Sequence, residues 1–169
     1  AAPVNATIAD NLGVGTITDN DAAPTIASVS SPTVAEGSDL IYTVTLSNAS
    51  STATTFAYTL GGGSAAAADY GTATFSNGVT LSGGILTVPA GVTSFELTLP
   101  TTQDALDEAD ETVPVTIGGV SGSGTITDDD ATPSLSIDDV KINEAAATEA
   151  VAVTLSAAVG QTVAVGYAS

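Results

Sequence analysis

The stretch that decides the fold is Gly124-Thr-Ile-Thr-Asp-Asp-Asp130, because the chain contains nearly the same words once before, as Gly15-Thr-Ile-Thr-Asp-Asn-Asp21. The two copies begin 109 residues apart, and self-similarity at a fixed period indicates a tandem repeat. Each copy alternates small and β-branched residues and ends in three acidic or amide side chains. We therefore expect a strand that delivers oxygen ligands to one end of a domain.

The charge of the chain excludes several classes of partner. Nineteen acidic residues stand against a single base, Lys141, which gives a net charge of −18. Nucleic acid and anionic membranes require basic patches, so neither is an expected partner. A hydrophobic fraction of 43% argues against disorder, which needs low hydrophobicity as well as high charge. Divalent cations are the usual means of neutralising so acidic a surface.

The residue types that are missing exclude most catalytic chemistry. The chain has no Cys, His or Arg, so disulfides, imidazole bases and guanidinium phosphate clamps are all unavailable. An enzyme would have to work with carboxylates alone, as in glycoside cleavage. No motif in the sequence indicates a substrate pocket, so we do not expect the chain to be an enzyme. The Met-free sequence, opening on Ala-Ala-Pro, reads as an interior excerpt of a longer exported protein. No apolar run is long enough to span a membrane.

The repeat divides the chain into three parts. Residues 1–22 are predicted to be the C-terminal hairpin of a preceding repeat, because residues 6–9 and 13–18 align without a gap with residues 115–118 and 122–127. Residues 23–131 form the complete repeat, which follows a Pro-bearing linker. Residues 132–169 carry the N-terminal strands of a following repeat.

Period-two alternation marks the strands of the complete repeat, within residues 40–46, 56–60, 95–99 and 113–117. The middle region, 72–91, predicts two or three further short strands, with a hairpin turn at Asn77-Gly78. Pro114 removes a backbone donor, so we expect a sheet edge or a bulge there. Short β-branched strands and Gly-rich turns without helical periodicity predict an all-β, Ig-like antiparallel sandwich.

Acidic side chains recur at the strand ends of the complete repeat. They are Glu36, Asp69, the acid-rich run 104–111, and Asp128 to Asp130. A single Asp often only forms a turn through its own backbone. Three adjacent Asp beside a loop of further acids repel one another unless a cation compensates. Calcium takes six to eight oxygens in irregular geometry, whereas magnesium keeps most of its water, so Ca2+ is the expected ion.

The order of six short sequence motifs resembles that of the Calx-β repeat, in the tandem form found in large RTX-type adhesins of Gram-negative bacteria. The matching words are Val34-Ala-Glu-Gly37, Tyr42-Thr-Val-Thr-Leu-Ser47, Ala68-Asp-Tyr70, Val88-Pro-Ala-Gly91, Asp107-Glu-Ala-Asp-Glu-Thr112 and Gly124-Thr-Ile-Thr-Asp-Asp-Asp130. The resemblance covers the complete repeat and both fragments. It implies a seven-stranded sandwich with calcium at one end.

Carried onto this sequence, the resemblance implies eight calcium ligands. They are Glu36, Asp69, Asp104, Asp107, Glu108, Asp128, Asp129 and Asp130. Two positions depart from the pattern, since Asn20 replaces the middle acid of the first fragment and Ala145 replaces Gly37 in the last. Asp138 and Asp139 have no acidic counterpart in the complete repeat, and they are candidates to complete a site with Asp130 across the linker.

Two functional hypotheses follow. The first is a calcium-stabilised extender repeat of a secreted adhesin on the cell surface, which serves attachment and biofilm formation and has neighbouring repeats as its partners. The second is a binding or self-assembly module, in which strand pairing between copies builds a surface filament. Neither involves insertion into a membrane, and the adhesive target is not encoded in any recognisable motif.

Overall fold

Short strands make up the ordered framework of the computed structural model, which describes residues 4–10, 12–145 and 148–166. Their bounds are β1 Ile26–Val29, β2 Thr33–Ala35, β3 Asp39–Leu46, β4 Thr54–Leu60, β5 Thr74–Phe75, β6 Thr80–Ser82, β7 Ile85–Val88, β8 Ser94–Pro100, β9 Glu111–Ile117, β10 Val120–Thr127, β11 Leu135–Ile137 and β12 Val153–Leu155. No helix that could cross a membrane occurs within those described ranges.

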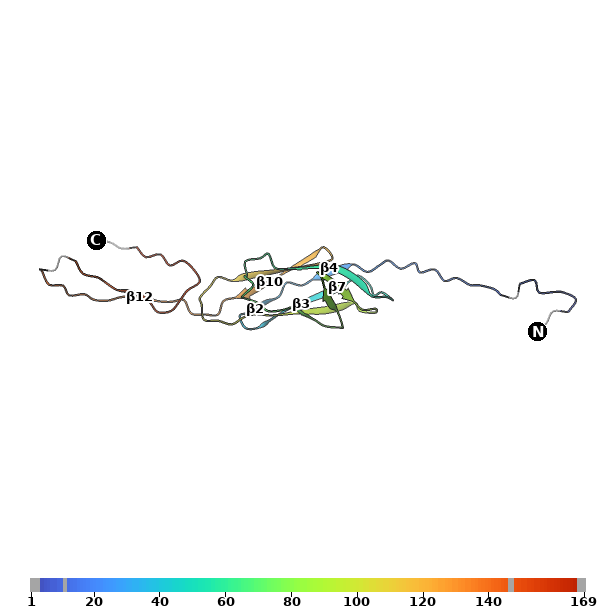
Figure 1. Ribbon diagram of the computed structural model, residues 1–169, viewed down its shortest axis with the longest axis horizontal. Coiled ribbons are helices and arrows are strands. Elements are labelled where there is room, and N and C mark those ends of the chain that lie inside the picture. The colour runs from blue at the N-terminus through green and yellow to red at the C-terminus, as the bar shows by residue number, and fades with distance from the viewer. Residues whose placement is uncertain (1–3, 11, 146–147, 167–169) are drawn as a thin grey trace.

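Two sheets face each other to form an all-β sandwich in the middle of an elongated molecule (Figure 1). One sheet has the order β1-β3-β8-β5, and the other has the order β2-β10-β9-β4-β7-β6. The segment around Pro32 divides β1 from β2 and places them in different sheets, because β1 pairs with β3 while β2 runs parallel to β10. This division is one reason the repeat has more strand segments than the seven that the resemblance implies.

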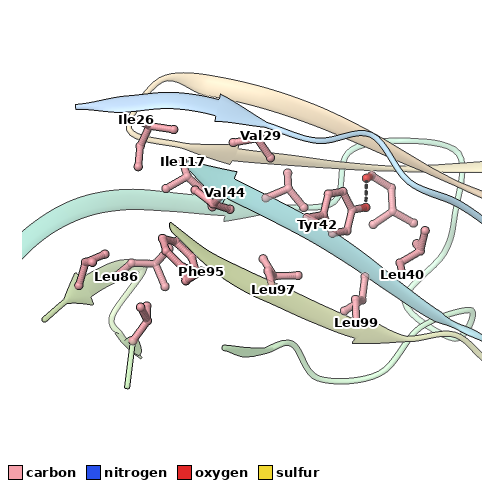
Figure 2. Close-up of a cluster of buried hydrophobic side chains, with 14 of the residues drawn as sticks. Ile26, Val29, Leu40, Tyr42, Val44, Leu86, Phe95, Leu97, Leu99 and Ile117 are labelled. Carbon is pink, nitrogen blue, oxygen red and sulfur yellow. Dashed lines mark hydrogen bonds between the residues drawn. The ribbon is translucent and has the colours of Figure 1, made fainter. Parts of the chain in front are cut away.

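The core lies between the sheets and is built by the alternation that the sequence shows. On β3, the inward side chains Leu40, Tyr42 and Val44 are fully buried, and those of β8 and β9 pack against them (Figure 2). The Tyr42 hydroxyl donates a 2.6 Å hydrogen bond to the Val113 carbonyl of β9, which ties one sheet to the other (Figure 2). Burial of these apolar side chains, eleven of which are fully buried, is the main stabilising contribution.

Pro114 corrects the expectation of an edge or a bulge. It lies in β9, between β10 and β4, and its register with β10 runs through Ser123 without a shift. The ladder with β4 ends at Leu60, and the Gly61 N–H donates to the Pro114 carbonyl at 2.9 Å. The donor that proline lacks therefore faces the end of a neighbouring strand, where the lost hydrogen bond ends the ladder without interrupting it.

The Asn77-Gly78 turn exists, but it does not close a hairpin. Both residues have positive φ, at 55° and 72°, as an Asn-Gly turn requires. The turn connects β5 to β6, and these strands belong to different sheets. The middle region, for which the sequence predicts two or three short strands, holds three, and the hairpin within it is β6–β7, which turns through Gly83-Gly84.

The first fragment does not form the expected hairpin within the described residues 4–10 and 12–22. These residues contain no strand, and Ile17 is 99% exposed. An isolated two-stranded hairpin is marginal in water, and this one has no second sheet to pack on. The assignment of residues 1–22 to a preceding repeat stays a prediction.

The last fragment reproduces the start of the complete repeat. β11 pairs with β12 in the register Leu135↔Leu155, and β1 pairs with β3 in the register Ile26↔Leu46, which lies 109 residues earlier at both positions. The Ser134 N–H donates to the Ser156 hydroxyl at 2.9 Å, as the Thr25 N–H does to Ser47 at 3.0 Å. The period found in the sequence therefore also holds at this end of the strand pair, whereas β1 has a register shift between Ile26 and Ser28 that β11 lacks.

Candidate metal centre

Six carboxylates gather at one end of the sandwich in two groups of three. The first group is Glu36, Asp104 and Asp130, and the second group is Asp69, Glu108 and Glu111. Within each triad, one oxygen of every residue lies within 4.8 Å of the others. That spacing is short enough for one cation to contact three carboxylates at once.

Parallel pairing of β2 with β10 positions the first triad. Thr127 is paired with Ala35, and the Glu36 N–H donates to the Thr127 carbonyl at 3.1 Å. Because parallel strands end at the same edge of a sheet, Glu36 and Asp130 leave that edge side by side. Asp104 reaches them from the loop that follows β8.

Three different segments supply the second triad. Glu111 is the first residue of β9, and Asp69 comes from a loop that is held by a 2.9 Å hydrogen bond from the Thr102 N–H to the Asp69 carbonyl. Glu108 is anchored at its backbone, since its N–H donates to Asp128 Oδ1 at 3.0 Å. The site therefore depends on the whole sandwich and cannot form from one loop alone.

A small hollow joins the two triads. Its lining includes Glu36 and Asp104 from the first triad and all three members of the second, with Ile126 from the core side. Its volume is about 10 Å³, which is close to the room of one water-sized sphere. A single ion of that size therefore fits between the carboxylates without a rearrangement of the fold.

Two carboxylate oxygens of the first triad have no partner. Glu36 Oε2 and Asp130 Oδ2 are buried, and neither makes a hydrogen bond with any described residue. A buried acceptor without a donor costs roughly 1–3 kcal/mol, and more when it is charged. A bound cation would satisfy both oxygens at once, so the residues present fit a metal ion.

The electrostatics of the site point the same way. Burial is the largest cause that raises the pKa of Glu111, to about 7, and a hydrogen bond and charge from Asp69 add to it. Burial also raises the pKa of Glu36, Glu108 and Asp130, with neighbouring carboxylates as further causes. Burial and the charge of neighbouring carboxylates both disfavour the ionised form of these groups, and a nearby cation would offset both effects.

The structure brings together five of the eight predicted ligands, namely Glu36, Asp69, Asp104, Glu108 and Asp130. The other three lie outside the triads. Asp128 supports the backbone of Glu108, and Asp129 accepts a 3.0 Å hydrogen bond from the Gln103 amide. Asp107 faces the following segment and accepts a hydrogen bond from the Thr132 hydroxyl at 3.3 Å. Neither triad includes Asp138 or Asp139, the candidates for a site across the linker.

Glu111 is the member of the site that the predicted ligand set leaves out. It lies in the acidic run, but it also precedes Val113, Val115 and Ile117, the three fully buried positions of β9, at the same period of two. A strand side chain in phase with core positions points inward. That phase is the signal in the sequence that identifies Glu111 as an inward-facing carboxylate.

Comparison with known proteins gives structural neighbours only. No protein-family model and no curated protein matches the sequence. The calcium-binding domain CBD12 of CALX1.1 superposes with a TM-score of 0.47 at 17% identity, covering 64% of this chain and 45% of that one. CBD12 from CALX1.2 gives 0.48 at 19%, covering 72% and 51%. Surface layer protein SbsC, domains 4–9, gives 0.35 at 17%, covering 79% and 20%. The chain spans about half the length of the two CBD12 structures.

Proposed function

We propose that this chain is a calcium-stabilised structural repeat of an extracellular bacterial surface adhesin, in which it holds an adhesive domain away from the cell. The observation that carries the proposal is the pair of carboxylate triads, with the orphaned oxygens of Glu36 and Asp130, at one end of the sandwich. Six acids meet there, and the chain contains only one base to offset them.

The donor set favours calcium among the common cations. Every candidate ligand is a carboxylate oxygen, which excludes ions that prefer sulfur or imidazole. The five carboxylates that line the hollow supply more protein oxygens than magnesium accepts, because magnesium retains several waters. Extracellular modules bind calcium at roughly 10⁻⁴–10⁻³ M, a range that suits an ion that loads outside the cell.

Calcium would act on stability through linkage. An ion that binds the folded chain and not the unfolded chain adds about 4 kcal/mol at a thousandfold excess over its Kd. The gain falls on the elements that end at the site, and the linker Ala131-Thr-Pro133 follows Asp130 directly. Binding therefore stiffens the exit of the domain as well as its core, which is the property that an extender requires.

Thermal unfolding with and without calcium tests the proposal. We expect the Tm in 10 mM calcium to exceed the Tm in EDTA by about 5–10 °C, because a ten- to hundredfold excess over a Kd of about 10⁻⁴–10⁻³ M adds about 1.4–2.7 kcal/mol. The double variant Glu36→Gln with Asp130→Asn should lose most of that shift. The matched control is Glu96→Gln, which removes one charge on β8 outside both triads and should keep the full shift.

Two results would count against the proposal. Superimposable melting curves in EDTA and calcium would exclude a stabilising ion. An equal loss of the shift in Glu96→Gln and in the double variant would mean that calcium acts only by screening the net charge of the chain.

A second candidate function is self-assembly into a filament. The observation that favours it is the two-stranded β11–β12 ribbon, in which Ile137 and Val153 are 68% and 55% exposed. A ribbon with two open edges and exposed apolar side chains is a template for strand addition from another copy. Sedimentation velocity over a hundredfold range of concentration tests this: assembly supports it, and a monomer throughout opposes it.

A further inference from the structure

The end of the sandwich that carries the metal centre also touches the segment that follows it. Asp107 forms an isolated parallel bridge with Val159, and the Gly160 N–H donates to the Asp107 carbonyl at 3.0 Å. Gly160 lies so close to the Glu108 side chain that a Cβ there would collide with it. The loop after β12 is therefore seated on the acidic loop 104–111 of the preceding domain.

The period of 109 residues gives that seated loop a counterpart in the complete repeat. Subtracting 109 places Val159 and Gly160 on Ser50 and Ser51, in the loop after β3. The correspondence is structural as well at the end of the strand pair next to this loop, where Leu135↔Leu155 repeats Ile26↔Leu46. The loop at 49–54 is thus built to face the domain on its own N-terminal side.

A large hollow lies at that N-terminal side. Its volume is about 750 Å³, and its walls are the linker residues 17–24 together with residues 49–52 and Thr54. The linker wall contains Asp19 and Asp21, which correspond to Asp128 and Asp130 at the other end. We call the contact of Val159 and Gly160 with Asp107 and Glu108 the C-terminal joint. The two walls of the hollow, a linker and the loop after β3, are the counterparts of the linker and the loop after β12 at that joint.

We infer that this hollow is the receiving half of a joint between repeats, and that its occupant is the acidic loop of a second copy of this domain placed before it through residues 15–24. At the C-terminal end of the sandwich, the corresponding position is occupied, since Asp107 of the acidic loop contacts Val159 and Gly160. Ser51 stands where Gly160 stands, so its N–H can donate to the loop backbone. Its Cβ takes the space that the Glu108 side chain fills beside Gly160, so the corresponding carboxylate must adopt another rotamer there, in which it can accept from the Ser51 hydroxyl.

The joint extends the proposed function without depending on it. Its observed hydrogen bonds use the Asp107 backbone and side chain, and Asp107 belongs to neither triad. Docking therefore needs no ion, although it fixes the loop that carries Asp104 and Glu108. Each repeat in an array would hold the calcium loop of the repeat before it.

The joint that is already present can be trapped in the 169-residue chain. The chain has no Cys, so Asp107→Cys with Val159→Cys creates one possible disulfide. Residues opposite each other in a strand bridge have the Cα spacing that a disulfide needs, so oxidation should be at least about tenfold faster than in a control pair. The control is Asp107→Cys with Val151→Cys, an exposed valine of the same fragment.

The N-terminal joint is tested in a longer chain that contains one additional repeat. Residues 1–131 followed directly by 23–169 keep the period, because Ala131 corresponds to Ala22. Asp107→Cys in the first copy is combined with Ser50→Cys in the second, and we expect the same fast cross-link in calcium and in EDTA. The control replaces Ser38 of the second copy, which precedes β3 at the acidic end of the domain.

The outcomes separate this inference from the calcium proposal. A Ser50 pair that oxidises no faster than the Ser38 pair overturns the joint, even if calcium still raises the Tm of the longer chain. A fast Ser50 cross-link in a chain whose Tm does not change with calcium supports the joint and overturns the proposal that calcium stabilises the repeat. Fast oxidation at Asp107 and Val159 together with slow oxidation at Asp107 and Ser50 also overturns the inference, because the two joints would then differ.

Discussion

Glu111 is the residue at which the needs of the core and of the metal centre meet. It occupies an inward position of β9, opposite Ile126, and its carboxylate faces Asp69 and Glu108. At pH 8, where the carboxyl of Glu111 is ionised, Glu111→Gln removes a half-buried like charge, so we expect a higher Tm than wild type in EDTA. The same change removes a ligand, so the calcium-induced shift should shrink and calcium affinity should fall by about tenfold. Calorimetry in the two buffers, with Glu96→Gln as control, measures both effects; a lower Tm in EDTA would contradict the assignment.

The raised pKa of Glu111 sets the pH dependence of the metal-free chain. Burial and Asp69 raise that pKa from 4.5 to about 7, so the folded chain binds a proton more tightly than the unfolded chain does. Stability is therefore lost as pH rises through 7 and regained as pH falls toward 5. In EDTA we expect the Tm to increase from pH 8 to pH 5, with a flatter profile for Glu111→Gln. A wild-type Tm that is constant over this range would exclude a raised pKa at Glu111.

The triple Asp shows what a sequence can and cannot say about single residues. Successive side chains of an extended chain point to opposite sides, so three adjacent acids cannot all enter one site. The structure directs Asp130 into the first triad, whereas Asp129 reaches Gln103 on the surface. Composition identifies the acidic end, but only the local backbone direction decides which acids face the hollow.

Among the elements, β10 shows why the repeated segment Gly124–Asp130 begins with glycine. A Cβ on Gly124 would meet the Tyr42 hydroxyl and Leu40, because β3 crosses close over β10. Gly15, the same letter in the first copy, has open space around it. We expect Gly124→Ala to lower the free energy of unfolding by about 1–3 kcal/mol and Gly15→Ala to leave it unchanged. Chemical denaturation measures both, and equal values would contradict the close packing of β3 on β10.

A double-mutant cycle separates this clash from the intrinsic preferences of a strand. Tyr42→Phe removes the hydroxyl and its hydrogen bond to Val113, at a cost of about 1–3 kcal/mol. It also removes an atom that Gly124→Ala would strike, so Gly124→Ala should cost less when it is combined with Tyr42→Phe than when it is made alone. We expect a coupling of about 1 kcal/mol between the two sites. Strict additivity would mean that the hydroxyl does not limit the space at Gly124.

The elements of the sandwich could be predicted because its strands alternate cleanly. β3, β8 and β9 bury every second residue, and period two shows directly in their letters. The contexts expected for Pro114 and Asn77-Gly78 are wrong because the effect of each depends on the neighbouring strand. The donor that Pro114 lacks would face the end of β4, where the loss of one hydrogen bond costs little. The positive-φ turn at Asn77-Gly78 can connect two strands of different sheets as well as two strands of a hairpin.

At the scale of the whole molecule, the described residues before β1 and the segment with β12 extend from opposite ends of the sandwich (Figure 1). An array built on this plan would be linear, with the candidate metal centre of each repeat beside the joint that we propose. The period of 109 predicted the β11–β12 pairing, since local strands can form it. It did not predict an open first fragment, because those strands need a sheet that is supplied from elsewhere.

Trypsin offers a test of the whole molecule on the unmodified chain. Lys141 is the one residue after which trypsin cuts, and it is exposed between β11 and β12. A cut there frees the segment that holds Gly160 against Asp107, because three residue pairs cannot keep β12 in place alone. The acidic loop then loses one hydrogen bond, so calcium affinity should fall by about two- to tenfold. Unchanged affinity in the nicked chain, measured by calorimetry after removal of residues 142–169, would show that the neighbouring segment contributes nothing to the metal centre.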